Sequence, residues 1–260
     1  MQKYLSDVEE WLERLYVAAE GAALRREDRR KACEVAAMLE EVEQAVSRFS
    51  HRSSLLLVDA AAGKSYVGIM AAKLVLAACS RPSHVLTIER DPRRVEASRR
   101  AVSRLDTTIP VECRAAAVEE DDAWPAQPSI ITALHACGHA ADAIIDRAIA
   151  CRTRTLLLVP CCTSDAVAAS DQAHAHADAI GIPHHAPVRR RFIQSIVDAE
   201  RTLRLEAAGY ETEVVEFVAP TITPHNLLWR ARLVREPRRM AIAKSAWVSL
   251  VAVHGNEAPI

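Results

Sequence analysis

Five short apolar runs separated by helical patterns constrain the fold of this chain most strongly. The runs lie at 55–58, 84–88, 111–113, 129–134 and 155–159. The segments between them carry apolar residues at helical spacing or are short connections. Apolar strand runs that are joined by helices indicate a parallel sheet covered on both faces. The sequence therefore predicts an α/β fold with a parallel sheet at its centre.

Two further strand patterns break this alternation near the end of the chain. Gly209 ends a helical segment, and the runs 213–218 and 227–234 follow with only a short loop between them. A parallel connection needs a crossover of a dozen or more residues, so these two strands should pair antiparallel. We therefore expect a mostly parallel sheet in which the last strand is antiparallel.

The segments on either side of this pattern are predicted to be appendages. Residues 1–52 carry two amphipathic helical patterns and should form a helical cap over a main domain at 53–236. Residues 237–260 form a C-terminal extension, and its apolar run at 246–253 has no role that the sequence indicates.

Bulk properties exclude several classes of protein. No apolar stretch is long enough to cross a bilayer, and the polar N-terminus does not resemble a signal peptide, so we expect a cytoplasmic protein. Seven cysteines, mostly inside apolar segments, indicate reduced thiols rather than a disulfide framework. The formal net charge of -1 provides no overall attraction to nucleic acid.

Ligands of open α/β sheets bind at the carboxyl ends of the strands. The first two predicted strands end in residues that could bind a cofactor. The first leads into the loop 59–65, where Asp59, Ala61 and Gly63 are predicted to contact a cofactor, because small residues let a ligand approach the backbone. Glu89 ends the second strand, where a carboxylate can accept hydrogen bonds from both ribose hydroxyls of a nucleoside. The alternative for Glu89 is that it caps the helix that begins at Pro92.

Two later strands add further candidates. Glu119, in an acidic run at 119–122, is predicted to accept a hydrogen bond from an adenine amino group, although its neighbours in the run fit equally well. His135, at the end of the fourth strand, is the predicted general base and a cofactor contact, because histidine titrates near neutral pH. Its alternative role is structural, as a hydrogen-bonded histidine beneath the cofactor.

Three other interpretations of these residues fit the sequence less well. A phosphate loop of the type G-x-x-x-x-G-K-[ST] needs glycine at position 58, which is a valine within a strand. Zinc would use the histidine and cysteine clusters near 135–139 and 161–162 or the histidine-rich loop 174–185, but no C-x-x-C pair exists, so we expect no metal. A cysteine hydrolase lacks a recognisable oxyanion-hole motif and leaves Glu89 unexplained.

Three motifs resemble the signatures of one methyltransferase family. They are Ala-Leu-His-Ala-Cys-Gly at 133–138, Val-Pro-Cys-Cys at 159–162, and Thr-Pro-His-Asn-Leu-Leu-Trp-Arg-Ala at 223–231. This family of class I S-adenosylmethionine-dependent methyltransferases is related to the tRNA acceptor-stem ribose methyltransferase and to the glutathione S-transferase C-terminal domain-containing protein. The resemblance spans roughly residues 55–234. It implies the Rossmann-like class I fold, S-adenosyl-L-methionine as the methyl donor, and a pocket bounded by these loops.

The first loop departs from the family pattern. The family's loop resembles D-x-G-x-G-K-G, whereas Ala61 and Ser65 occupy the first and third glycine positions here. Alanine fits such a turn if its φ stays negative, and serine can still donate to the ligand. Cys161, His225 and Asn226 are predicted to lie at the acceptor side of the pocket.

The acceptor itself is open to two interpretations. A small molecule is preferred, because the charge is neutral, the chain is compact and a helical cap is expected. RNA fits the family relatives and the basic cluster 189–191, although phosphate tracking usually needs a broader basic surface. A third possibility is a degenerate methyltransferase fold that only binds a partner, which the altered glycine loop suggests. The sequence does not predict the oligomeric state.

Overall fold

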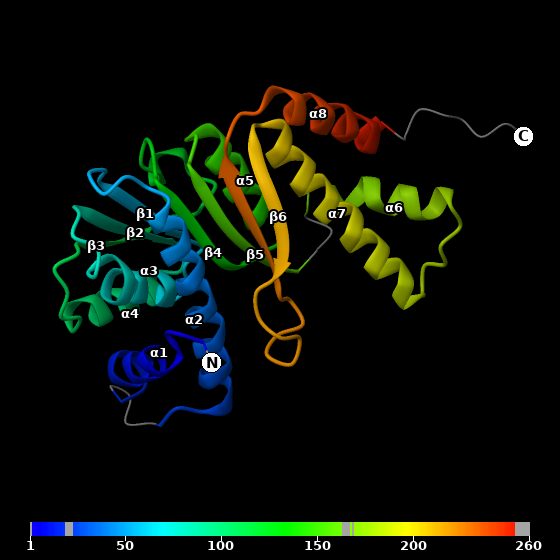
Figure 1. The fold of residues 1–260 in the computed structure, drawn as a ribbon. Helices are drawn as coiled ribbons and strands as arrows, with labels where there is room; N and C mark the ends of the chain where they lie inside the picture. The colour runs from blue at the N-terminus through cyan, green and yellow to red at the C-terminus, as the bar shows by residue number, and fades with distance from the viewer. Residues whose placement is uncertain (1, 19–22, 163–166, 168, 253–260) are drawn as a thin grey trace, which may run out of the picture.

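The computed structural model describes residues 2–18, 23–162, 167 and 169–252, and a seven-stranded sheet forms its centre (Figure 1). The strand order is β3-β2-β1-β4-β5-β7-β6. The strands are β1 (Leu55–Ala60), β2 (Ser83–Glu89), β3 (Val111–Ala115), β4 (Ile130–Cys137), β5 (Thr155–Cys162), β6 (Tyr210–Glu216) and β7 (Leu227–Leu233).

The strand directions confirm the predicted fold class. Neighbouring strands from β3 to β5 are parallel, whereas β7 is antiparallel to both β5 and β6. The strand order reverses next to β1, between β1 and β4, and open α/β sheets bind their ligands in the crevice beside such a switch point. The sheet is therefore of the Rossmann-like methyltransferase type, with the antiparallel β7 inserted between β5 and β6.

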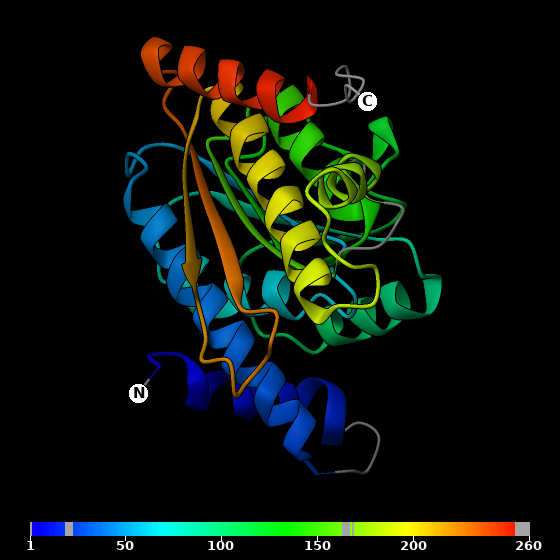
Figure 2. The same cartoon turned by 90° about the vertical axis from the view of Figure 1, so that its right-hand side faces the viewer.

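Helices cover both faces of the sheet (Figures 1 and 2). They are α1 (Leu5–Leu12), α2 (Arg26–Ser47), α3 (Tyr66–Met70), α4 (Pro92–Ser103), α5 (His139–Ala150), α6 (Ser170–Ala179), α7 (Pro187–Ala207) and α8 (Pro237–Ala252), with π-helical turns at Glu13–Val17 and Ala71–Leu76 and a 3-10 turn at Asp121–Ala123. The proline at the first turn of α4 lies where the sequence predicted it, since its missing N–H is not needed there.

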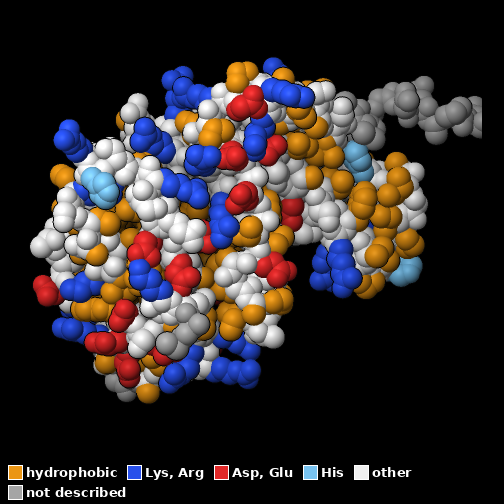
Figure 3. All heavy atoms as spheres, viewed as in Figure 1, with side chains coloured by type: hydrophobic (Ala, Val, Ile, Leu, Met, Phe, Trp, Pro, Cys, Tyr) orange, Lys and Arg blue, Asp and Glu red, His pale blue; other side chains and the backbone are white. Residues whose placement is uncertain are grey.

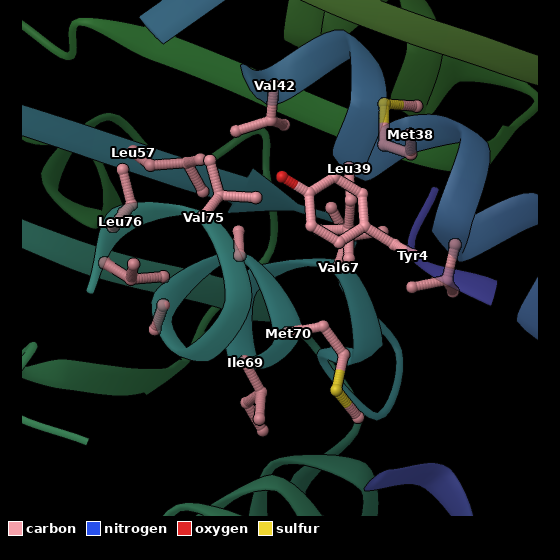
Figure 4. Close-up of a cluster of buried hydrophobic side chains, with 14 of the residues drawn as sticks. Tyr4, Met38, Leu39, Val42, Leu57, Val67, Ile69, Met70, Val75 and Leu76 are labelled. Atoms are coloured by element: carbon pink, nitrogen blue, oxygen red, sulfur yellow. The ribbon is translucent and has the colours of Figure 1, made fainter. Parts of the chain in front are cut away.

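Alternating strand residues divide the core into two layers. Leu57 faces a cluster built with α1, α2 and α3, whereas Val58 faces a cluster built with α5 and α7. Figure 4 shows part of the first cluster, in which Tyr4, just before α1, and Leu39 of α2 lie among side chains of β1 and the segment 67–76. The N-terminal helices therefore bury their apolar faces against the sheet layer, which supports their predicted amphipathic character.

The C-terminal run at 246–253 falls largely within α8, which packs across α7 (Figure 2). Trp247 Nε1 donates a hydrogen bond to Glu200 Oε1 of α7 at 3.2 Å. One expectation was wrong: His174 and His176 lie on α6 rather than in a loop, because the segment 170–179 is helical. The division of the chain at 52/53 and 236/237 stays a prediction. No helix in the described ranges has the length and apolar character that crossing a membrane requires.

Candidate functional site

Two adjoining cavities lie at the carboxyl edge of the sheet, beside the switch point. The first has a volume of about 330 Å³ and is lined by Lys31, Asp59, Ala61, Ala62, Gly63, Lys64, Tyr66, Val67, Arg94, Leu134 and His135. The second has a volume of about 250 Å³ and is lined by Ala61, Glu89, Arg90, Arg94, Val118, Glu119, His135, His139 and Ala140. Three residues line both cavities: Ala61, Arg94 and His135. We call them together the paired cavities, and all six predicted cofactor contacts line one or both.

The loop between β1 and α3 keeps a glycine-like backbone although two of its glycine positions are substituted. Ala61, Gly63 and Ser65 have φ angles of 51°, 59° and 59°. The condition under which alanine fits this turn without strain, a negative φ, is therefore not met at Ala61. The left-handed region costs a residue with a Cβ atom about 1–2 kcal/mol. This loop stores backbone strain beside the paired cavities.

Replacing Ala61 by glycine is expected to raise the free energy of unfolding by about 1 kcal/mol, because glycine adopts a positive φ without strain. Ser65→Gly should act in the same direction, since it also removes a buried hydroxyl that has no hydrogen-bond partner. Urea denaturation measures both effects. Ala62→Gly is the matched control: Ala62 has no positive φ, so glycine there should destabilise the protein. Equal effects at Ala61 and Ala62 would contradict the strain argument.

Glu89 ties the loop to the end of β2. Its Oε2 accepts a hydrogen bond from the Gly63 N–H at 2.8 Å, and its Oε1 accepts one from the Asp91 N–H at 2.9 Å. The side chain is buried, and it lines the second cavity. The alternative role as the cap of α4 belongs to Asp91, whose carboxylate accepts the Arg93 N–H. Glu89 therefore binds the loop through the Gly63 N–H and lines the second cavity.

Asp59 lies beneath the same loop and is almost completely buried, with 1% of its surface exposed. Its Oδ2 accepts the Gly68 N–H at 2.8 Å, and Thr132 Oγ1 donates to its Oδ1 at 3.2 Å. Burial raises the pKa of this carboxyl to about 7, and the nearby charge of Glu89 acts in the same direction, whereas the two hydrogen bonds oppose them. Asp59 therefore anchors the start of α3 and titrates near neutral pH.

His135 is paired with a carboxylate from the N-terminal segment. Its Nε2 lies 2.8 Å from Glu34 Oε1 of α2, and Lys31 Nζ lies 2.7 Å from Glu34 Oε2. Burial by itself raises the pKa of Glu34, but the hydrogen bonds from His135 and Lys31 outweigh it and lower that pKa below its usual value. His135 also has a positive φ of 65°, where the pairing of β4 with β5 shifts register. A carboxylate thus orients the imidazole at the wall of both cavities.

The acidic residues of the run 119–122 have different contacts. Glu119 lines the second cavity, and its Oε1 lies 2.9 Å from His139 Nε2. Glu120 accepts the Ala117 N–H within the turn, and Asp121 pairs with Arg147. Of this run, only Glu119 lines either of the paired cavities.

The sequence missed the contribution of the first helices to this site. Tyr16 donates its hydroxyl proton to the carbonyl oxygen of Lys64 at 2.8 Å, and Lys31 lines the first cavity. The signal was present in α2: Glu34, Met38, Glu41 and Ala45 recur at helical spacing on its buried face. Two acids on an apolar stripe require partners. Those partners are His135 and Arg230, whose guanidinium binds Glu41 through two hydrogen bonds of 2.7 and 2.6 Å.

The predicted acceptor residues lie outside the paired cavities. His225 and Asn226 belong to the loop between β6 and β7, at the same edge of the sheet, and line neither cavity. Asn226 is buried and donates through Nδ2 to the Val218 carbonyl oxygen at 2.9 Å, whereas His225 is exposed. The side chain of Cys161 lies outside the described residues. Within the described ranges, no three histidine, cysteine or acidic side chains are placed to hold a metal ion.

Comparison with known proteins assigns the family. The model of a family described as a methyltransferase domain matches residues 30–168, more than half of the chain. The match begins inside α2 and includes the loop 59–65, Glu89, Glu119 and His135. No curated protein matches the chain.

Solved structures with a similar fold include several methyltransferases. Magnesium protoporphyrin IX methyltransferase from Synechocystis PCC 6803, with bound SAH, is 13% identical, with 88% of this chain and 95% of that chain covered and a TM-score of 0.48. The SAH-bound methyltransferase PaMTH1 from Podospora anserina is 12% identical, with 90% and 89% covered and a TM-score of 0.48. An rRNA methylase from Streptococcus thermophilus is 10% identical, with 75% and 95% covered and a TM-score of 0.44.

The family match and the strand order of the sheet agree with each other. The match covers β1 to β5, which carry the paired cavities, and the antiparallel β7 completes the sheet type that the motifs predicted. The chain belongs to this methyltransferase domain family.

Proposed function

We propose that this protein transfers a methyl group from S-adenosyl-L-methionine to a small-molecule acceptor, with the donor held in the paired cavities. One observation carries the proposal. Six residues that come from four strand ends all line these cavities: Asp59, Ala61, Gly63, Glu89, Glu119 and His135. S-adenosyl-L-methionine is a nucleoside that bears a sulfonium and an amino acid group, so it needs a ribose acceptor, an adenine contact and a carboxylate.

Each part of the donor has a matching group in this arrangement. Glu89 accepts hydrogen bonds from the ribose hydroxyls, and Glu119 accepts one from the adenine amino group. The small residues of the loop 59–65 allow close approach of the donor to the backbone, and Asp59 beneath them supplies negative charge for its cationic groups. The donor is already activated, so the protein mainly aligns the methyl carbon with the acceptor.

His135 acts as the general base where the acceptor must lose a proton. The carboxylate of Glu34 contacts Nε2 and fixes the orientation of the imidazole, which leaves Nδ1 as the nitrogen that can take the proton. We propose that Cys161, His225 and Asn226, which belong to the motifs at 159–162 and 223–231, bound the acceptor site beyond the paired cavities.

The N-terminal helices favour a small acceptor. We propose that residues 1–52 form a cap, because Tyr16 binds the donor loop and Lys31 and Glu34 reach the cavity wall and His135. A cap of this kind encloses a small molecule more readily than an RNA strand. RNA, which the resemblance to the tRNA acceptor-stem enzyme suggests, is the alternative outcome of the test below.

The donor site is tested by calorimetric titration of the purified protein with S-adenosylhomocysteine. We expect binding in the micromolar range, on the order of -8 kcal/mol. Methyl-labelled donor incubated with separate small-molecule and RNA fractions of a cell extract then identifies the acceptor class. Label in nuclease-sensitive material would replace the small-molecule proposal by RNA, and absence of S-adenosylhomocysteine binding would contradict the enzyme proposal itself.

A further inference from the structure

A second, larger cavity lies at the opposite edge of the sheet, where β1, β2, β4 and β5 begin and β7 ends. Its volume is about 900 Å³. It is lined by Phe49, Ser53, Ser54, Leu55, Leu56, Pro82, Ser83, His84, Gln127, Pro128, Ser129, Arg152, Arg154, Leu233, Val234 and Arg235. We call it the amino-edge cavity. The donor site proposed above uses none of these residues.

The charged residues that line this cavity are all basic. Arg152, Arg154 and Arg235 line it together with His84, and no acidic residue is among its lining residues. All three arginines are exposed to solvent, and none of them forms an ion pair with a described residue. The formal net charge of the protein is -1, so this concentration of positive charge is local. Several guanidinium groups that line one cavity without a carboxylate partner favour an anionic ligand.

Backbone strain occurs at the same place. Among the described residues, five that are not glycine have positive φ angles, and three of them (Ala61, Ser65 and His135) belong to the donor loop or to the wall of the paired cavities. The other two are Arg152 and Arg235, each with a φ of 53°. Arg152 directly follows the C-cap of α5, and the Thr153 N–H bonds to the Ala148 carbonyl oxygen at 3.0 Å, so the end of the helix accounts for its left-handed φ. Arg235 lies at no helix C-terminus, so its strain is the one that points to a ligand site, and glycine would satisfy both positions with less strain.

Helix dipoles do not account for these arginines. Arg152 follows the end of α5, where a cation is favourable. Arg235, however, lies just before α8 begins at Pro237, where the dipole disfavours a cation, and Arg154 lies over the ring of Phe49, 5.5 Å from its centroid. The convergence of the three side chains on one cavity therefore needs a separate explanation.

We propose that the amino-edge cavity is a second binding site, which takes a compact ligand bearing phosphate groups. Arginine presents a planar set of N–H donors that matches phosphate oxygens, and Ser53, Ser83 and Gln127 add further polar groups to the wall. The cavity is large enough for a nucleotide. Figure 3 shows Lys and Arg side chains gathered over the upper left of the molecule, the part where the amino ends of the first strands lie. The arginines that line the cavity come from two loops that meet there.

The test is calorimetric titration of the full chain with tripolyphosphate and with ATP at constant ionic strength. The double variant Arg152→Gln/Arg235→Gln should bind both probes about tenfold more weakly or worse, because two charged hydrogen-bonding groups are lost. Arg191→Gln is the matched control, since Arg191 is exposed on α7 and forms no ion pair with a described residue. S-adenosylhomocysteine titration of each variant checks the fold and keeps the two sites separate.

A glycine variant gives a second, independent readout. Arg152→Gly removes both the charge and the strain, so it should weaken binding of tripolyphosphate while raising Tm by about 2–4 °C. Equal binding of both probes by the wild-type protein and the double variant would overturn the inference. Binding of single-stranded RNA that is much tighter than ATP and equally sensitive to Arg191→Gln would also overturn it, in favour of an extended nucleic-acid surface. Loss of S-adenosylhomocysteine binding alone would count against the donor site and not against this one.

Discussion

Replacing Glu89 by alanine is expected to weaken the binding of S-adenosylhomocysteine by about 100-fold or more. The carboxylate holds the Gly63 N–H and the Asp91 N–H, and we propose that it also accepts the ribose hydroxyls. A hydrogen bond to a charged group contributes about 1.5–3 kcal/mol, so the loss of two such bonds accounts for this change. Alanine would also leave the Gly63 N–H without its partner and release the loop from β2.

Two controls separate the role of Glu89 in binding from its role in folding. Glu89→Gln keeps the shape of the side chain and removes its charge, so affinity should fall by about tenfold, less than for alanine. Glu120→Gln is the matched control, because Glu120 accepts a backbone N–H in a nearby turn but lines neither of the paired cavities. Calorimetry gives the affinities, and thermal unfolding reports the stability. Unchanged affinity in a folded Glu89→Ala protein would remove Glu89 from the donor site.

The strands could be predicted from the sequence because of how they are buried. β1, β4 and β5 are covered on both faces, so their apolar runs stand out against the polar loops. The antiparallel pairing of β6 with β7 followed from the short loop between them. The insertion of β7 between β5 and β6 was not predicted by any local pattern, because it depends on long-range packing. Local patterns also failed for the helix α6, because its histidines led to the prediction of a loop.

The candidate site could be predicted where it lies at strand ends and not where it depends on distant packing. Gly63 and Glu89 follow directly from the positions of β1 and β2. Glu34 and His135 are 101 residues apart in the chain, so no local pattern predicts their contact. The available signal was an acidic residue on the apolar face of a helix, which requires a partner. The sequence also did not predict the positive φ of Ala61, because the geometry of the loop overrides the local preference of alanine for negative φ.

The second large effect concerns Asp59 and pH. Its pKa is about 7 in the folded protein and about 3.9 in an unfolded chain, so the folded state holds the proton more tightly. The contribution of a raised carboxyl pKa to stability is complete below the unfolded pKa and is lost as pH rises through the folded pKa. Near pH 8 the donor-free protein therefore carries a cost of up to about 4 kcal/mol for ionised Asp59.

Asp59→Asn should remove this cost, because a neutral amide can accept the Gly68 N–H and donate to Thr132 Oγ1. We expect the variant to be more stable than the wild-type protein at pH 8, by a few kcal/mol on the order that the pKa shift implies. At pH 4 the two proteins should be similar in stability, since Asp59 is then protonated in the folded state. Urea denaturation at both pH values measures the difference, and parallel stability profiles would contradict the buried ionisation of Asp59.

Donor binding should favour the ionised form of Asp59 over the protonated form. S-adenosyl-L-methionine brings positive charge into the cavity that Asp59 lines, and a nearby cation favours the carboxylate form. Its binding near pH 7 should therefore release a proton, and its affinity should rise between pH 6 and pH 8. Calorimetry in buffers of different ionisation enthalpy measures the number of protons released on donor binding. The Asp59→Asn variant should release none when it binds the donor. A carboxyl group that costs stability in the donor-free protein thus strengthens binding of the cationic donor, which gives a physical reason for a buried aspartate at this position.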